Sequence, residues 1–251
     1  MSILSTVSKP ADRPVLITVC GDSGLGKTTL ACTFPKPIVI RAEDGLQAIS
    51  VDRRPDAFPV LTGVDMLWDQ LKGLMHEEHQ YRTLVVDSVT ALERMFTLHV
   101  VETDPKKPRS IQQALGGYGA GRDAVAAMHA RVRKAAGILA EKRGMNTVFV
   151  AHADTSRVEP PDDDAYMRYT LRLHEKSMPA YVDDVDIVGF LKLETFTTGD
   201  GDKKKAISDG TRILITHATA ANVSKNRYGI TEPLTVETGI NPLTAYIGAL
   251  K

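Results

Sequence analysis

The feature that most constrains the fold is an apolar stretch that runs directly into a glycine-rich signature for phosphate binding. Residues 15–20, VLITVC, are apolar and β-prone, which is typical of a buried strand. The residues that follow, GDSGLGKT, match G-x-x-x-x-G-K-T and lead into a helical pattern. A strand, a glycine-rich loop and a helix in this order predict a chain that binds a nucleoside triphosphate.

The residue types of this loop suit phosphate. Glycines permit a tight turn and a close approach of the backbone, whose N–H groups then form a nest for anions beside the positive end of the following helix. Lys27 is expected to reach the β- and γ-phosphates, and the Thr28 hydroxyl to bind Mg²⁺. The predicted ligands are ATP and Mg²⁺, and the predicted nucleotide-binding residues are Gly21, Asp22, Ser23, Gly24, Leu25, Gly26, Lys27, Thr28 and Thr29.

The rest of the chain alternates strands with helices, which predicts an α/β fold with a mainly parallel, twisted sheet flanked by helices. A late hairpin predicts antiparallel strands at one edge near the C-terminus. We expect strands at 15–20, 38–42, 58–63, 83–87, 147–152, 186–196 and 212–219. We expect helices after Lys27 and at 64–80, 88–102, 119–143 and 241–250. Loops are expected at 103–118, 153–181 and 197–210.

Length and charge limit the organisation and the partners. With 251 residues we expect a short polar lead-in, 1–13, followed by one ATPase domain, 14–251. The formal net charge is zero, so any binding of nucleic acid must come from local basic patches. The sequence shows neither a signal-peptide core nor a membrane-length apolar run, which predicts a cytoplasmic protein without a membrane partner.

Three further residues are expected beside the phosphates. Asp87 ends an apolar strand and should orient Mg²⁺ through water. Ser88 follows it where many ATPases have the water-activating Glu, so Glu43, just past the strand at 38–42, is the predicted catalytic carboxylate. The alternative is that Glu43 caps the next helix. His152 ends another strand and is either a sensor of the γ-phosphate or a half-buried, hydrogen-bonded histidine.

Residues alone leave three functional classes open: a DNA-dependent ATPase, a small-molecule kinase, and a nucleotide-dependent scaffold. In a kinase, residues 154–176 would form a lid with Arg157, Arg168 and Arg172. A GTPase would need an Asn/Thr-Lys-x-Asp base reader, which the sequence lacks, so ATP is preferred. Stimulation of hydrolysis by single-stranded DNA separates the first class from the other two.

Several segments resemble the phage-encoded members of the RecA-like recombinase ATPases, which are described as single-strand annealing proteins. These segments are TLVVDSVTAL, GGYGAGRDAV, VFVAHADT, MPAYVDDVDIVGFLKLE and KNRYG, within residues 14–240. The resemblance implies a RecA-like P-loop core and an ATP-dependent, single-stranded DNA-binding function in annealing or homologous recombination. It also implies a homo-oligomer with ATP at subunit interfaces, a single-strand-binding protein as a possible partner, and the host cell cytoplasm as the location.

The same resemblance assigns roles to particular residues. Glu43 corresponds to the catalytic glutamate, Asp87 to the Mg²⁺-orienting aspartate and His152 to the switch residue. The loops at 103–118 and 153–178 correspond to the two DNA-binding loops.

Two basic clusters complete the expected site. Lys106, Lys107 and Arg109 lie together on one loop, and Tyr118 follows them at its end. Positive charge combined with an aromatic ring is a common way to bind single strands. Lys225 and Arg227 would point to one face of an extended segment. The resemblance implies that this pair reaches the ATP of the adjacent subunit, as an arginine finger does. The alternative for each cluster is an exposed, solvated loop or turn.

Overall fold

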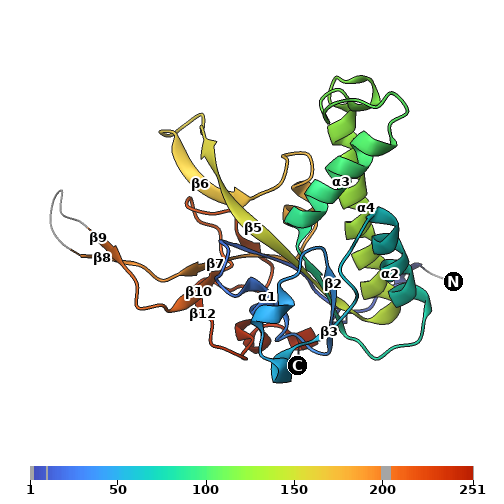
Figure 1. Ribbon diagram of the computed structural model, residues 1–251. Helices are drawn as coiled ribbons and strands as arrows, with labels where there is room; N and C mark the ends of the chain where they lie inside the picture. The colour runs from blue at the N-terminus through green and yellow to red at the C-terminus, as the bar shows by residue number, and fades with distance from the viewer. Residues whose placement is uncertain (1–2, 10, 199–204, 251) are drawn as a thin grey trace.

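The computed structural model describes residues 3–9, 11–198 and 205–250. A central sheet runs through the molecule in the order β12-β10-β7-β1-β5-β4-β2-β3 (Figure 1). Its middle strands are parallel, as expected where helical crossovers connect them. They are β1 (Leu16–Gly21), β2 (Pro37–Arg41), β3 (Asp56–Ala57), β4 (Thr83–Asp87), β5 (Asn146–Val158) and β7 (Ile187–Leu193).

The late strands of the chain lie antiparallel at the β7 side of the sheet. β10 (Arg212–Ile215) pairs with β7, and β12 (Leu234–Thr235) pairs with β10. β11 (Lys225–Asn226) pairs with the start of β7. The predicted α/β class, with a mainly parallel sheet and antiparallel strands near the C-terminus, is confirmed.

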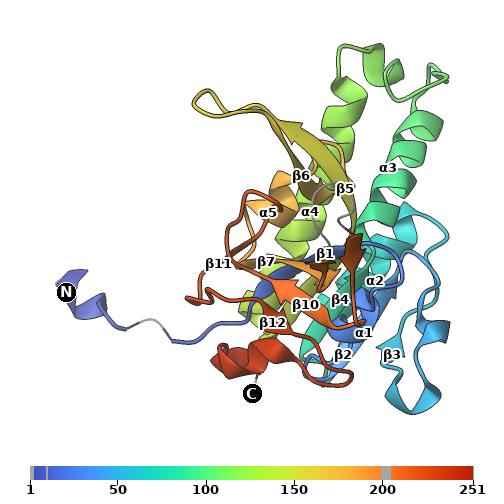
Figure 2. The same ribbon diagram turned by 90° about the vertical axis from the view of Figure 1, so that its left-hand side faces the viewer.

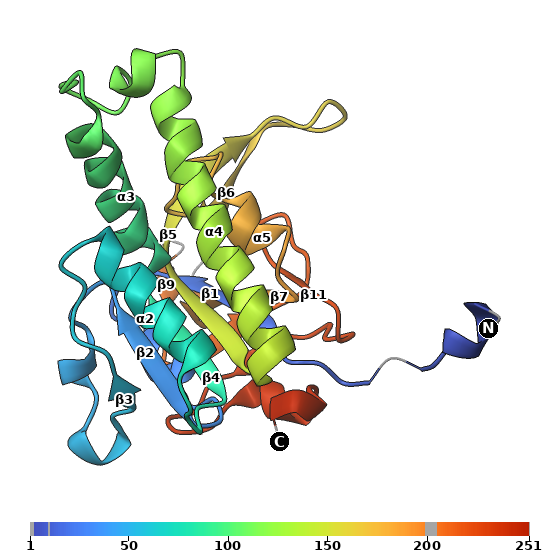
Figure 3. The same cartoon turned by 90° about the vertical axis from the view of Figure 1, so that its right-hand side faces the viewer.

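Helices cover the two faces of the sheet unequally. One face is covered by α2 (Val64–His76), α3 (Val89–Thr103) and α4 (Ala120–Arg143), which run side by side (Figures 1 and 3). The short α1 (Lys27–Ala31), η2 (Leu46–Ala48), η6 (Pro242–Ala245) and η7 (Gly248–Leu250) contribute to the other core. The remaining short elements are η1 (Ile3–Thr6), η3 (Val51–Arg53), η4 (Ala114–Gly116) and α5 (Pro179–Val182).

Local sequence explains why α2 and α3 form where they do. In α2, Leu67, Leu71 and Leu74 recur at helical spacing and are at most 2% exposed. At the start of α3, the Ser88 hydroxyl accepts a hydrogen bond from the backbone N–H of Ala91, which is the predicted cap. α3 therefore occupies the predicted segment to within one residue, whereas α2 ends at His76 and not at residue 80.

Two arms project from the sheet in the same direction (Figures 1 and 2). One is formed by α3, α4 and the loop between them. The other is a β-hairpin in which β5 continues past His152 and pairs with β6 (Tyr166–Leu171). The prediction of irregular structure at 153–181 was therefore wrong for the hairpin, because the six residues 153–158 find a local antiparallel partner in 166–171.

Three other predicted elements differ from the structure. The third strand is not at 58–63 but two residues earlier, where Asp56 and Ala57 pair with β2. The predicted helix at 241–250 is two 3₁₀ turns, although Asn241 caps the first by accepting from the N–H of Leu243. In the predicted loop at 197–210, β8 (Phe196–Thr198) pairs with β9 (Lys205–Ile207), and residues 199–204 lie outside the described part.

The N-terminal residues run away from the sheet before β1 begins (Figures 2 and 3). The predicted boundary between a lead-in and a domain at residue 13 stays a prediction, although β1 does begin shortly after it. In the part of the chain described above, none of the helices combines the length and the apolar character that crossing a lipid bilayer requires.

Candidate active site

The glycine-rich loop has the backbone conformation that its sequence predicts. Gly24 and Gly26 have φ angles of 82° and 85°, in the left-handed region that favours glycine. Gly21 is needed for another reason, because a Cβ there would lie 2.4 Å from the carbonyl oxygen of Leu191 on the neighbouring strand β7. The helix that follows has only five residues, so its contribution to anion binding is smaller than expected. The loop N–H groups and Lys27 therefore carry most of the attraction for phosphate.

A cavity of about 550 Å³ opens above this loop at the carboxyl ends of the parallel strands. Open α/β sheets bind their ligands at this edge. Of the predicted residues, those that line the cavity are Ser23, Gly24, Gly26, Lys27, Thr28, Thr29, Glu43, Asp87 and His152. Asp22 contributes its carbonyl oxygen, to which the Lys27 ammonium donates at 2.8 Å. Gly21 and Leu25 are in the loop but do not line the cavity.

Thr28 and Asp87 meet as a Mg²⁺ site requires. The Thr28 hydroxyl donates to the Asp87 carboxylate at 2.8 Å, and Asp87 is 3% exposed. Burial raises the pKa of Asp87, and the hydrogen bond from Thr28 opposes this rise. Burial also lowers the pKa of Lys27, against the attraction of nearby anions. One hydroxyl and one carboxylate suit Mg²⁺, which keeps several waters and takes its other ligands from substrate phosphates.

Glu43 and His152 form a hydrogen-bonded pair in the same cavity. His152 Nε2 lies 3.1 Å from Glu43 Oε1, and Nδ1 lies 3.3 Å from the Ser23 hydroxyl. In the tautomer with its proton on Nε2, His152 donates to Glu43 and accepts from Ser23. The neighbouring Asp44 pairs instead with Arg41. The ring of His152 therefore connects the phosphate loop to the predicted catalytic carboxylate.

The pair with His152 stabilises the ionised form of Glu43. The hydrogen bond from His152 is the main cause that lowers the pKa of Glu43 to about 2. Glu43 is therefore ionised near neutral pH and is better suited to orienting an attacking water than to removing its proton. It does not cap the next helix, because η2 has Gly45 at its N-cap and no side-chain hydrogen bond there.

Several lining residues of this cavity were not predicted as site residues, namely Asp44, Gly45, Ala48, Ile49 and Arg212, and among them Arg212 is the cation. Arg212, at the start of β10, lines it beside the phosphate loop and donates to the Thr238 hydroxyl at 3.1 Å. No local motif could have indicated it, because its position depends on the pairing of β10 with β7.

The predicted DNA-binding residues lie away from this cavity, at the tip of the α3–α4 arm. Lys106, Lys107 and Arg109 are exposed, and Tyr118 is fully exposed. The Asp104 carboxylate orders the loop by accepting from the N–H of Lys106 at 2.9 Å and from that of Leu115 at 2.6 Å. The basic side chains themselves remain available to a ligand.

Lys225 and Arg227 lie near the amino ends of the parallel strands, opposite the end that carries the phosphate loop. Lys225 pairs with Val188 at the amino end of β7, and its ammonium donates to the carbonyl oxygen of Asp183 at 2.7 Å. Arg227 lies 3.2 Å from the buried carboxylate of Asp186. β11 ends at Asn226, one residue before Arg227, so the shared face of the two cations stays a prediction. Within one chain they do not line the cavity of the phosphate loop.

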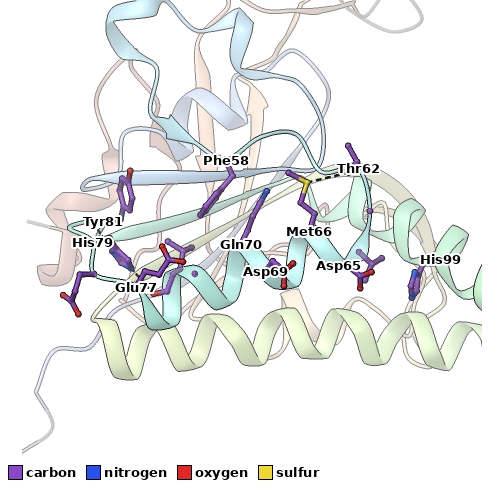
Figure 4. A pocket seen from close by; sticks show the side chains of 15 residues that line it. Phe58, Thr62, Asp65, Met66, Asp69, Gln70, Glu77, His79, Tyr81 and His99 are labelled. Atoms are coloured by element: carbon purple, nitrogen blue, oxygen red, sulfur yellow. Dashed lines mark hydrogen bonds between the residues drawn. The ribbon is translucent and has the colours of Figure 1, made fainter.

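A larger cavity, about 940 Å³, lies along α2 and not at the phosphate loop (Figure 4). Four carboxylates line it: Asp65, Asp69, Glu77 and Glu78. Negative charge of this density disfavours a triphosphate, so the smaller cavity at the carboxyl ends of the strands is the candidate nucleotide site.

Comparison with known proteins agrees with this geometry. Residues 13–228 match the family model described as "AAA domain". The chain is also 26% identical over 195 residues to the SPbeta prophage-derived uncharacterized protein YorG of Bacillus subtilis (strain 168). That match covers 75% of the present chain and 53% of the relative, so the chain spans about half the length of the curated relative it matches. With the family model covering most of its length and the phosphate loop, Thr28 and Asp87 assembled in one cavity, the chain belongs to the AAA domain family of P-loop ATPases.

Proposed function

We propose that this protein is an ATP-dependent, single-stranded DNA-binding protein that promotes annealing or homologous recombination. The observation that carries the proposal is that both projecting arms begin at residues of the nucleotide site. β4 ends at Asp87 and α3 begins at Val89, so the α3–α4 arm starts directly after the Mg²⁺-binding carboxylate. β5 carries His152 in the site and continues into the hairpin.

The α3–α4 arm offers the chemistry that a single strand requires. Three exposed cations, Lys106, Lys107 and Arg109, can follow a phosphate backbone, and Tyr118 can stack on a base. Because phosphate contacts release counterions, the binding should weaken steeply with salt and depend little on sequence.

The hairpin presents a second mixed surface of basic and apolar side chains. Arg157 lies opposite Met167, and Thr155 lies opposite Tyr169, so alternate residues place these four on one face. Met167 is 59% exposed and Tyr169 is 41% exposed. The turn between the strands contains Asp162, Asp163 and Asp164, which disfavour phosphate. DNA is therefore proposed to contact the face of the ladder rather than its tip.

The chemistry proposed for the cavity is attack of water on the γ-phosphate. Lys27 and the loop N–H groups hold the triphosphate, and Thr28 and Asp87 hold Mg²⁺, which would offset the charge that develops in the reaction. Ionised Glu43 orients the water. His152 is placed to change partners between Glu43 and the γ-phosphate, and so to transmit hydrolysis along β5 to the hairpin.

The proposal also includes the partners and the setting. The active form is a homo-oligomer with ATP at subunit interfaces, a single-strand-binding protein is a possible partner, and the host cell cytoplasm is the compartment. The prophage origin printed in the name of the matched relative supports a phage setting.

The structure gives less support to the kinase alternative. A kinase lid would bring Arg157, Arg168 or Arg172 to the phosphates, and none of them is among the residues that line the nucleotide cavity. The hairpin projects away from the sheet instead of closing over it (Figure 2).

The deciding measurement is the rate of ATP hydrolysis with and without single-stranded DNA. We expect stimulation by single strands that exceeds stimulation by duplex of equal nucleotide concentration. Lys27→Ala should abolish hydrolysis in both conditions because it removes the charge opposite the β- and γ-phosphates. A hydrolysis rate that single strands leave unchanged, with no binding in a filter or anisotropy assay, would argue for the scaffold or kinase class.

A further inference from the structure

We propose that Arg212 is a nucleotide-binding residue that contacts the phosphate nearest the nucleoside. The inference rests on the proposed ATP-binding function and adds a ligand contact from the antiparallel edge of the sheet. Neither the glycine-rich motif nor the neighbouring strand ends indicate this residue.

The guanidinium lies against the phosphate loop. A Cβ built on Gly26 would be 2.7 Å from Nη1 of Arg212, so the side chain occupies the space that a larger residue at position 26 would need. Arg212 also lines the same cavity as Lys27 and Thr28. A positive charge thus adjoins the loop on the side of β10, where it adds to that of Lys27.

The charge of Arg212 is not neutralised by a carboxylate. Within the described residues, none of the ion pairs includes it, and its hydrogen bond to the neutral Thr238 hydroxyl uses one of five N–H donors. Three carboxylates share the cavity with it, and each has another partner. Glu43 has His152, Asp44 has Arg41, and Asp87 has Thr28. A half-buried guanidinium with free donors at the wall of a phosphate cavity is a site for an anion.

A second cavity identifies which phosphate this is. It measures about 460 Å³ and adjoins the first, because Thr29 and Ile49 line both. Thr238, the hydrogen-bond partner of Arg212, lines the second cavity together with Arg53 and Gly239. Arg212 therefore lies at the junction of the two cavities. The triphosphate in the first and the nucleoside in the second would place the α-phosphate beside it.

This contact would connect two parts of the fold. Arg212 is the first residue of β10, and Thr238 follows β12, so a nucleotide bound by both would hold the antiparallel edge against the phosphate loop. Because the α-phosphate is common to ATP and ADP, the contact should contribute equally to the binding of both nucleotides.

The test measures binding of Mg-ATP and Mg-ADP by wild type, Arg212→Ala, Arg212→Lys and Thr238→Val, each checked for folding by thermal unfolding. A charged hydrogen bond of this kind corresponds to a loss of about 10- to 100-fold in affinity. We expect that loss for both nucleotides in Arg212→Ala, and a smaller, equal loss in Arg212→Lys and in Thr238→Val. Lys72→Ala, which removes an exposed cation on α2, is the matched control and should bind as wild type does.

The outcomes separate the two proposals. Wild type that fails to bind either nucleotide would contradict the proposed function itself. If wild type binds and Arg212→Ala binds equally well, the inference about Arg212 is wrong. A loss confined to ATP would overturn the placement at the α-phosphate. Should Arg212→Ala not fold, Arg212→Lys and Thr238→Val decide, because unchanged affinity in both would contradict the contact.

Discussion

At the scale of single residues, Glu43, hydrogen-bonded to His152, is the group proposed to orient the attacking water. Glu43→Gln keeps the shape of the side chain but removes the negative charge that orients water. We expect ATP binding to remain and the hydrolysis rate to fall about 10²- to 10⁴-fold. Single-turnover hydrolysis and nucleotide binding, measured on the same preparation, check this.

Asp44 supplies the control for that variant. It lines the same cavity as Glu43 but pairs with Arg41, so Asp44→Asn removes an equal charge while leaving the Glu43–His152 hydrogen bond in place. We expect Asp44→Asn to hydrolyse ATP at close to the wild-type rate. Equal losses in both variants would mean that the local negative charge, and not Glu43 itself, supports hydrolysis.

Asp87 makes the binding of Mg²⁺ sensitive to pH. Burial raises its pKa above the ordinary value of 3.8, so it gains a proton at a higher pH than an exposed aspartate does. The protonated form lacks the charge that orients Mg²⁺. We therefore expect the Mg²⁺ concentration for half-maximal hydrolysis to rise as pH falls toward this raised pKa.

Comparison with Asp87→Asn isolates that effect. The phosphates of ATP also gain protons, with a pKa of about 6 for a terminal phosphate, but they do so equally with both proteins. The asparagine variant should need more Mg²⁺ at every pH and should show only the dependence due to ATP. Identical pH dependences in the two proteins would remove Asp87 from the effect.

A site residue could be predicted when residues near it in the sequence determine its position. It could not be predicted when its position depends on a strand that is distant in the sequence. Lys27, Thr28, Asp87 and Glu43 follow strand ends in the sequence, and parallel strands bring their carboxyl ends to one edge. Arg212 could not be found in this way, because its place depends on the antiparallel register between β10 and β7. The close packing of Gly21 against Leu191 could not be predicted either, because it depends on the pairing of β1 with β7.

At the scale of elements, apolar periodicity identified the buried strands and the amphipathic helices but not the hairpin arm. Burial forces a pattern on α2 and β4, whereas most hairpin side chains from 154 to 169 are exposed or half-exposed and need no apolar alternation. The two proline residues and three aspartates of its turn also indicated a loop. The C-terminal segment has the predicted cap, Asn241, but its next turns are 3₁₀, and the apolar spacing of 241–250 did not distinguish these from an α-helix.

The α3–α4 arm carries the prediction that belongs to this scale. Replacing Lys106, Lys107 and Arg109 together by Ala should weaken binding of single strands and lower its dependence on salt, because each lost phosphate contact reduces the slope by about 0.7. Basal hydrolysis should persist, since the loop does not line the nucleotide cavity. Titrations at several salt concentrations measure both effects.

A matched set on α4 tests whether position or only charge matters. Arg131→Ala, Lys134→Ala and Lys142→Ala combined remove the same charge from α4, away from the loop. We expect that variant to retain most of its affinity. If the loop variant binds single strands with the wild-type salt slope, residues 106–109 are not part of the DNA surface.

At the scale of the whole molecule, the carboxyl ends and the amino ends of the parallel strands carry different groups of residues. The carboxyl edge holds the nucleotide site and both arms. The amino edge holds an ionic cluster in which the buried Asp186 carboxylate accepts from Arg13 at 2.5 Å, from the N–H of Leu16 at 3.0 Å and from Arg227 at 3.2 Å. Because Asp186 has two other partners, Arg227 can leave without stranding a buried charge, and the same holds for Arg13.

The resemblance implies that Arg227 reaches the ATP of an adjacent subunit, and this role is a proposal that variants can test. We expect Arg227→Ala to fold and bind ATP but to hydrolyse it poorly in the assembly, because an arginine finger stabilises charge on the γ-phosphate. Arg13→Ala, which removes a comparably exposed cation from the same carboxylate, is the control and should hydrolyse ATP normally.

Mixing variants tests whether Glu43 and Arg227 serve one site from two subunits. A mixture of Glu43→Gln and Arg227→Ala contains interfaces where the first supplies an intact Arg227 and the second an intact Glu43. Those interfaces should recover part of the wild-type rate, and the recovery should rise with total protein concentration as assembly proceeds. If mixed assemblies form, shown by co-purification of differently tagged subunits, and remain as inactive as either parent, Arg227 acts only within its own chain, as a partner of Asp186.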